Sequence, residues 1–239
     1  MKNPDLTPPV RPASNHLIAT LPARECARIK AQCESVELEA GKMVCEEGAA
    51  LEHVYFPVTG VISLVKVLTA HPCIEIKQIG NEGMLGATVL LGVDIAPERS
   101  LVQSSGTALR MRTEQLVKTL QVCPAAAQNL NHYLYADMVQ LTQTAICFRF
   151  HDLAQRLART LLMAHDRAHS DHFHMTHQML ADMLGVQRGG VTIAAGHLQR
   201  AQIIHYTRGR ISIMDRQALE AASCGCYSAV MDVYARLLP

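Results

Sequence analysis

Two arginines near the C-terminus are spaced for contact with a phosphate backbone. Arg208 and Arg210 flank a glycine in the run Thr-Arg-Gly-Arg, which separates two short β-forming segments, residues 203–206 and 211–214. This pattern predicts a β-hairpin with a basic tip. A guanidinium donates paired hydrogen bonds to phosphate oxygens, so we predict that both arginines contact the backbone of a nucleic acid.

A second candidate for chemistry is a cluster of histidines in residues 165–177. His165 and His169 are four residues apart on a predicted helix, a spacing that places two imidazoles on one face, where they could hold a metal ion. The alternative interpretation is a solvent-exposed linker rich in polar residues. The other histidines of the segment are His172, His174 and His177.

The basic hairpin directly follows a predicted pair of short helices in residues 176–199. The first helix is predicted from four apolar residues at helical spacing: Met179, Leu180, Met183 and Leu184. Gly185 then allows the left-handed backbone that commonly ends a helix. The predicted buried face of the second helix consists of Val191, Ala194, Ala195 and Leu198. This is the pattern of a helix-turn-helix with a β wing, in which the start of the second helix enters the major groove of DNA.

The N-terminal half of the chain has the pattern of a β domain. Short β-forming segments alternate with glycine turns, at residues 53–57, 61–68, 73–79, 101–104 and 108–112. Such strands form a β-sandwich or barrel, and their number and spacing favour a β jelly roll.

A long helix is predicted to follow the β domain. Its apolar seam steps by four, three, four and three residues: Leu134, Met138, Leu141, Ala145 and Phe148. A heptad seam packs along a partner helix, and a second copy of this helix would supply one, so we predict a two-fold homodimer. The alternative is that the helix packs only on its own β domain. Asp152 is the predicted N-cap of the next helix.

Composition and motifs exclude several classes of protein. No run approaches 18 apolar residues, so we predict no membrane span, and the Pro-rich start lacks the apolar core of a signal peptide. Eight cysteines without an export signal predict reduced thiols in the cytoplasm. The net charge is only +1, but residues 176–216 hold five arginines against two aspartates, which is a local basic surface. No common hydrolase or nucleotide-binding motif is present, so we predict that the protein is not an enzyme.

The order of these parts resembles the Crp/Fnr family of transcriptional regulators. Two motifs carry the resemblance: Gly-Lys-Met-Val-Cys-Glu-Glu-Gly at residues 41–48 with the strand at 54–62, and Leu-Gly-Val-Gln-Arg at 184–188 with Val-Thr at 191–192. The resemblance implies an α+β chain with a cyclic-nucleotide-binding-like jelly roll and a winged helix-turn-helix. We place a flexible leader at 1–17, the sensor domain at 18–122, the dimerisation helix at 123–149 and the DNA-binding domain at 150–239. The implied partners are a second copy of the chain and a palindromic operator in double-stranded DNA, with RNA polymerase as a further candidate.

The resemblance assigns roles to individual residues of the helix-turn-helix. Arg188 is the best candidate for reading a base, because a guanidinium can donate two hydrogen bonds to guanine. Gln187 and Thr192 are the implied base contacts beside it, with the alternative that Thr192 is buried. Thr176 and Gln178, at the start of the first helix, resemble phosphate contacts of the family.

The resemblance also implies an effector site in the first domain. In family members that bind a cyclic nucleotide, a Gly-Glu turn and a later Arg-Ser pair hold the ribose and the phosphate. The corresponding residues here are Gly80, Glu82, Gly83, Arg99 and Ser100, and Thr142 on the long helix could face a purine. The cofactor stays unknown, since a cyclic nucleotide and an empty, vestigial site are both compatible with this loose match.

Three functions are compatible with these features. The leading hypothesis is a dimeric transcription factor whose operator binding responds to an effector in the first domain. The second is a constitutive DNA-binding regulator with a degenerate, ligand-free sensor domain. The third is a metal-dependent jelly-roll enzyme, which is disfavoured because His53 and His71 are too few and too far apart to form a metal site.

Overall fold

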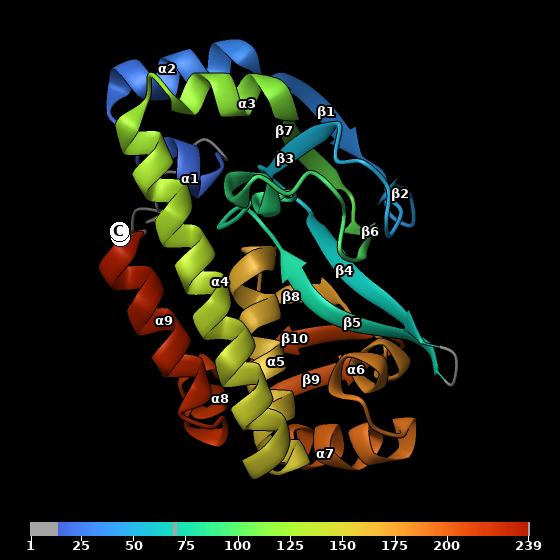
Figure 1. Cartoon of the computed structure of the whole chain (residues 1–239). Helices are drawn as coiled ribbons and strands as arrows, with labels where there is room; N and C mark the ends of the chain where they lie inside the picture. Colours follow the sequence, from blue (N-terminus) through green and yellow to red (C-terminus); the bar gives the residue numbers. More distant parts are fainter. Residues whose placement is uncertain (1–13, 69–70, 239) are drawn as a thin grey trace, which may run out of the picture.

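The chain forms an N-terminal β domain, a long helix and a C-terminal helical domain with a small sheet (Figure 1). The computed structural model describes residues 14–68 and 71–238, so most of the predicted leader lies outside the described residues. Residues 14–17, which the sequence assigns to the leader, belong to the β domain. Asn15 is buried, and its side-chain amide donates to the backbone oxygens of Pro57 and Gly83 at 3.0 and 2.8 Å. The folded domain therefore begins earlier than predicted.

The β domain consists of two antiparallel sheets, with strand orders β1-β7-β3 and β2-β6-β4-β5. Buried side chains from both sheets share one core, so the sheets pack face to face and form the predicted jelly roll. The strands are β1 (Glu34–Leu38), β2 (Met43–Cys45), β3 (His53–Pro57), β4 (Val61–Leu68), β5 (His71–Ile79), β6 (Arg99–Ser104) and β7 (Gly106–Arg112). The helices of this domain are α1 (His16–Ala19), α2 (Ala23–Gln32), the 3-10 helix η1 (Ala87–Leu91) and α3 (Thr113–Leu120).

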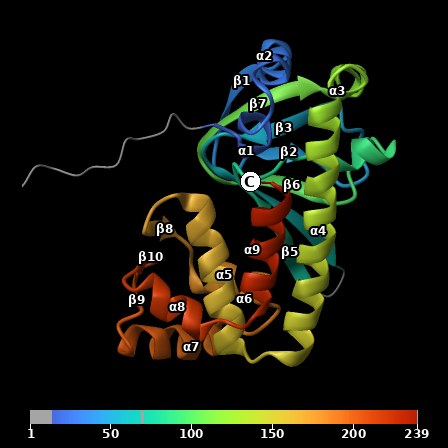
Figure 2. The same cartoon turned by 90° about the vertical axis from the view of Figure 1, so that its left-hand side faces the viewer.

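A single long helix, α4 (Pro124–Phe150), joins the two domains at the position where the sequence predicts a long helix (Figure 2). The last helix, α9 (Cys226–Leu237), runs back along α4, so the end of the chain returns to the β domain. Val233 of α9 and Leu238 join the core that contains Leu130 and Tyr133 of α4. No helix in the described part of the chain, α4 included, is long and apolar enough to cross a membrane.

The C-terminal domain begins with the predicted N-cap. Asp152 accepts a hydrogen bond from the Gln155 amide at 2.9 Å and starts α5 (Leu153–Ala168). The histidine-rich segment is partly ordered as a strand, which corrects its interpretation as a linker: β8 pairs with β10 in the sheet β8-β10-β9. The remaining elements are β8 (His172–His174), α6 (His177–Leu184), α7 (Arg188–Arg200), β9 (Ile204–Thr207), β10 (Arg210–Ile213) and α8 (Arg216–Ala222).

Candidate DNA interface

The turn between α6 and α7 has the geometry that its sequence predicts. Thr176 caps α6 by accepting a hydrogen bond from the Met179 amide at 3.1 Å. Gly185 ends α6 in a left-handed conformation with φ of 60°, which an L side chain adopts only with strain. The four residues predicted to form the inner face of α7 are all buried: Val191, Ala194, Ala195 and Leu198.

The first turn of α7 is exposed at one end of the molecule. In both views α7 lies far from α2 and α3, at the opposite end of α4 (Figures 1 and 2). Gln187 and Arg188 are exposed, and within the described residues the Arg188 guanidinium has no hydrogen bond or ion pair. Thr192 is also exposed, so the alternative prediction that it is buried is wrong. Ile193 beside it is exposed as well and presents an apolar side chain of the kind that contacts thymine methyl groups.

His177 connects the start of α6 with the first turn of α7 and with the wing. The Thr192 hydroxyl donates to the Arg188 carbonyl at 3.0 Å, so His177 Nδ1, 3.0 Å from Thr192 Oγ1, is the donor in that contact. The His177 ring stacks on Tyr206 of β9 with centroids 4.0 Å apart. Burial and the nearby Arg188 charge lower the pKa of His177, which keeps the imidazole neutral at pH 7. These contacts fix the three predicted DNA-binding segments relative to one another.

The wing is a tight two-residue hairpin. Thr207 pairs with Arg210, and Arg208 and Gly209 between them have φ of 45° and 82°. Positive φ at both central positions is the mark of a type I′ turn, which suits the twist of a β-hairpin. Arg208 and Arg210 are exposed, and in the described part of the chain neither takes part in an ion pair. A Cβ at Gly209 would lie 3.1 Å from Thr176, so the wing tip adjoins the start of α6.

Gln178 completes the set of predicted DNA contacts. It is exposed on the first turn of α6, where its side-chain amide donates to Asp182 at 2.8 Å. The predicted base contacts thus come from the N-cap and first five residues of α7, and the predicted phosphate contacts come from the α6 start and the wing beside it. Such an arrangement suits a helix in the major groove with flanking contacts to the backbone.

We expect Arg210→Ala to weaken DNA binding by a similar factor for all sequences. The side chain is assigned to a phosphate, so its loss should lower the slope of log affinity against log salt by about 1 in magnitude for each half-site bound. Binding isotherms on several duplexes at graded salt measure both effects. Arg28→Ala, which removes an exposed arginine of α2, is the control and should leave the slope unchanged. A loss confined to one DNA sequence would contradict the phosphate assignment.

The turn that resembles a phosphate cassette contacts the DNA-binding domain. Glu82 accepts a hydrogen bond from Arg167 Nε of α5 at 2.8 Å, and both side chains are largely buried. Burial acts to raise the pKa of Glu82, but the Arg167 charge and hydrogen bonds more than offset it and leave this pKa below its ordinary value. A Cβ at Gly80 would lie 3.0 Å from Arg167, and one at Gly83 would collide with the Tyr133 ring. The glycines therefore allow close packing.

The other predicted effector residues do not converge on one phosphate site. The Arg99 guanidinium donates to Glu46 at 2.7 Å, and the Ser100 hydroxyl donates to the Cys45 carbonyl at 3.4 Å. Thr142 is exposed on α4 and donates to the Met138 carbonyl at 2.9 Å. The structure thus gives Glu82 and Arg99 different partners from those that the family resemblance implies.

A cavity of about 220 Å³ lies between the β domain and α4. Apolar side chains dominate its lining, and Ser100 is the only one of the predicted effector residues that reaches it among those described. Lys77 also lines the cavity, but its ammonium group is paired with Asp137. An anionic ligand there would have to compete with that carboxylate.

We expect Glu82→Gln to destabilise the chain on the order of 3 kcal/mol, because it leaves the Arg167 charge buried without a counter-charge. The contribution of Glu82 is present above the ordinary glutamate pKa of about 4.3 and is lost as the pH falls through the lowered folded-state pKa. Urea unfolding at pH 7, and at a series of pH values from about 4.5 down to about 2.5, measures both. Glu34→Gln, which breaks the exposed pair with Arg110, is the control and should change stability little. Equal effects of the two variants would contradict a structural role for the buried pair.

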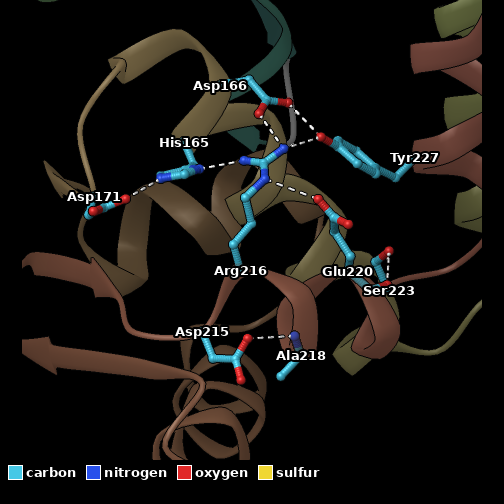
Figure 3. Close-up of polar contacts among 9 residues, drawn as sticks. All are labelled: His165, Asp166, Asp171, Asp215, Arg216, Ala218, Glu220, Ser223 and Tyr227. Atoms are coloured by element: carbon cyan, nitrogen blue, oxygen red, sulfur yellow. Dashed lines mark hydrogen bonds and ion pairs between the residues drawn. The ribbon is translucent and has the colours of Figure 1, made fainter. Parts of the chain in front are cut away.

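The two histidines proposed as metal ligands do not share a helix face. α5 ends at Ala168, and His169 is its C-cap with φ of 48°, so the prediction of a paired i, i+4 face is wrong. His165 Nδ1 accepts from the Arg216 guanidinium, which can only donate, and Nε2 therefore donates to Asp171 at 2.7 Å (Figure 3). His169 Nε2 lies 2.8 Å from Asn81 Oδ1 instead. Both imidazoles thus have partners that are not metal ions.

Comparisons with known proteins agree with this geometry. Residues 155–222 match the Crp-like helix-turn-helix domain. No curated protein is significantly similar in sequence. Among solved structures, the c-di-GMP responsive global regulator CLP of Xanthomonas campestris has a TM-score of 0.67 and 16% identity, over 80% of this chain and 99% of that chain. FixK2 from Bradyrhizobium japonicum gives 0.66 and 17%, over 80% and 98%. A CRP/FNR family regulator from Thermus thermophilus gives 0.62 and 21%, over 80% and 98%. At these identities the likeness establishes the fold.

Proposed function

Residues 155–222 are a Crp-like helix-turn-helix domain in a chain with the Crp/Fnr-type regulator fold, and we propose that the protein is a sequence-specific DNA-binding transcriptional regulator. The observation that carries the proposal is the exposed first turn of α7, where Arg188 is free of partners among the described residues and lies on the helix adjoining the arginine wing. This surface favours DNA binding over the jelly-roll enzyme. Such a regulator works in the cytoplasm, with RNA polymerase as a further partner.

The active form in this proposal is a homodimer joined along α4. Tyr135, Met138, Leu141 and Phe148 are large apolar side chains that remain exposed on this helix in the single chain. A stripe of this kind along one long helix suits a second copy of the same helix. Two α7 helices related by a two-fold axis would read a palindrome whose half-sites are about 34 Å apart, one turn of DNA.

A constitutive regulator is the second candidate, and the pairing of the cassette residues favours it. Glu82 is paired with Arg167 and Arg99 with Glu46, so a cyclic nucleotide would have to displace one or both contacts. The cavity beside α4 also offers mainly apolar contacts. A ligand-free sensor domain would then act as a scaffold for the dimer.

Selection of binding sites from random duplex DNA tests the proposal. The expected result is an inverted repeat whose half-site centres are one helical turn apart. Repeating the selection with the chain stripped of ligand, and again with cyclic AMP or cyclic di-GMP added, separates the two candidates. Tight binding without any added nucleotide supports the constitutive regulator, whereas failure to enrich any sequence under all conditions would overturn the function.

A further inference from the structure

Four side chains of metal-binding type meet where α4 ends. Cys147 and His151 come from the last turn and C-cap of α4, and Cys224 and Cys226 come from the corner between α8 and α9. One ligand atom of each residue lies within 4.8 Å of the corresponding atoms of the others. The three cysteines are buried and His151 is half-buried. Segments 77 residues apart in the chain thus place three thiols and one imidazole around a common centre.

The distances within this cluster fit a single tetrahedral ion. Cys147 Sγ lies 3.4 Å from Cys224 Sγ, and Cys226 Sγ lies 3.6 Å from His151 Nδ1. A tetrahedral zinc ion with bonds of about 2.3 Å to sulfur and 2.0–2.1 Å to nitrogen has ligand edges of about 3.8 Å and 3.6 Å. Small side-chain adjustments would therefore bring all four ligands into place.

The backbone around the cluster holds its four residues in position. Cys147 lies on the last turn of α4, and His151 is the extended C-cap of this helix, whose backbone amide donates to the Cys147 carbonyl at 3.1 Å. Tyr227, the residue after Cys226, accepts a hydrogen bond from Arg216 at 2.6 Å and donates one to Asp166 at 2.9 Å (Figure 3). Arg216 also pairs with Asp166 at 2.8 Å. This network ties α8 and the start of α9 to α5.

A buried positive charge beside the cluster points to an anion at this place. Arg159 is 6% exposed, yet it has no carboxylate partner in the described part of the chain, and its Nε is buried without a hydrogen bond. Its Nη2 donates to Thr144, a neutral group, at 3.1 Å. Arg159 and Cys147 line the same cavity, so this guanidinium lies beside the cluster. Three thiolates around a divalent ion carry a net charge of −1 and would supply the missing counter-charge.

We propose that Cys147, His151, Cys224 and Cys226 bind one Zn²⁺ in a closed, structural site. Thiolate and imidazole ligands in tetrahedral geometry select zinc, and four protein ligands leave no open position for catalysis. A surface cavity lined by Ser223, Cys224 and Gly225 gives the ion a route of entry. The ion would clamp the end of α4 to the start of α9, next to residues 150–152 that link α4 to the DNA-binding domain.

The consequence for DNA binding rests on the proposed function. The clamp fixes the angle between the dimerisation helix and the helix-turn-helix, so removal of zinc is expected to weaken operator binding at least tenfold. Metal binding itself is measured without DNA. If the protein did not bind DNA, the zinc site would still be present and measurable. If the cluster bound no zinc, the protein would still be able to bind DNA.

The test uses the full chain, purified under reducing conditions, stripped with a chelator and titrated with Zn²⁺ or Co²⁺. We expect one ion per chain, the absorption bands of tetrahedral cobalt bound to thiolates, and a rise in Tm of about 10 °C at saturating zinc. Cys224→Ser and His151→Ala each leave three ligands, so they should bind cobalt roughly tenfold or more weakly and with altered bands, whereas His151→Cys should keep tight binding because it restores a fourth ligand. Cys33→Ser, a half-buried cysteine outside the cluster, is the control and should bind cobalt as the parent does.

Two outcomes would overturn the site. One is a reduced parent chain that gives no cobalt–thiolate bands at micromolar metal, a result that does not depend on whether any variant folds. The other is a disulfide between Cys147 and Cys224, found by mass spectrometry after alkylation, in a chain that takes up no metal once reduced. In that case the same thiols would be a redox pair.

Discussion

The double substitution Met138→Glu with Leu141→Glu is expected to convert the protein into a monomer and to abolish operator binding. Both side chains lie on the apolar stripe of α4, and they are 66% and 49% exposed in the single chain, so the folded monomer can tolerate the change. In a dimer the four introduced carboxylates would be buried close together without partners, at a cost of several kcal/mol. Because a monomer binds only one half-site, affinity for the palindrome should fall by roughly 10²–10⁴-fold.

Light scattering with size-exclusion chromatography measures the mass, and a binding isotherm on the selected palindrome measures the affinity. The control is Gln121→Glu with Gln128→Glu, which adds the same charge at exposed positions near the other end of α4, outside the seam. Circular dichroism checks that each variant is folded. A dimer that persists with glutamate at residues 138 and 141 would show that α4 is not the interface, and the alternative of a helix packed only on its own domain would gain support.

The DNA-binding half could be predicted from the sequence because its signals are local. A positive φ at Gly185, the cap at Asp152 and the hairpin at Arg208-Gly209 each depend on a few neighbouring residues. The apolar spacing in α7 likewise predicted its buried face residue by residue. These short-range rules also fixed the bounds of β9 and β10 to within one residue of the observed strands.

The effector residues show where a family pattern stops being informative. The residue types at Glu82 and Arg99 match a cyclic-nucleotide cassette, but their partners are set by residues far away in the chain. Arg167 is 85 residues from Glu82, and Glu46 is 53 residues from Arg99. No local sequence pattern predicts either ion pair. The contact between the turn that contains Glu82 and the DNA-binding domain could therefore be found only from the structure.

The cysteine cluster was missed for a related reason, although one signal was present. Two thiols separated by Gly225 are a weak metal motif without further ligands, and the other two ligands lie on α4. Cys147 and His151 are four residues apart, but the predicted helix ends at residue 149, so the helical spacing that singled out His165 and His169 did not point to this pair. The return of α9 along α4, which brings the halves together, is a tertiary contact that no spacing reveals.

Arg188→Ala is expected to remove discrimination at one base pair of each half-site. Arg188 is the first residue of α7, and its side chain is exposed. Its guanidinium has no partner within the described residues, so it is free to contact a base when DNA binds. Loss of a bidentate contact to guanine costs about 1–3 kcal/mol per half-site, or roughly 5- to 150-fold, and the two half-sites of a palindrome multiply the effect. Duplexes altered at single base pairs should then bind the variant and the parent with different rankings.

Arg200→Ala is the matched control, because it removes an equal charge from the last residue of the same helix. Its guanidinium contacts His197 within the chain. Arg200 also lies about three helical turns from Arg188, and so from the end of α7 that we predict to enter the major groove. The comparison separates reading from attraction: a base contact changes the ranking of sequences, whereas a lost charge lowers all affinities together and reduces the salt slope. If both arginine variants weakened every duplex by the same factor, Arg188 would be a phosphate contact, and base reading would have to come from Gln187, Thr192 or Ile193.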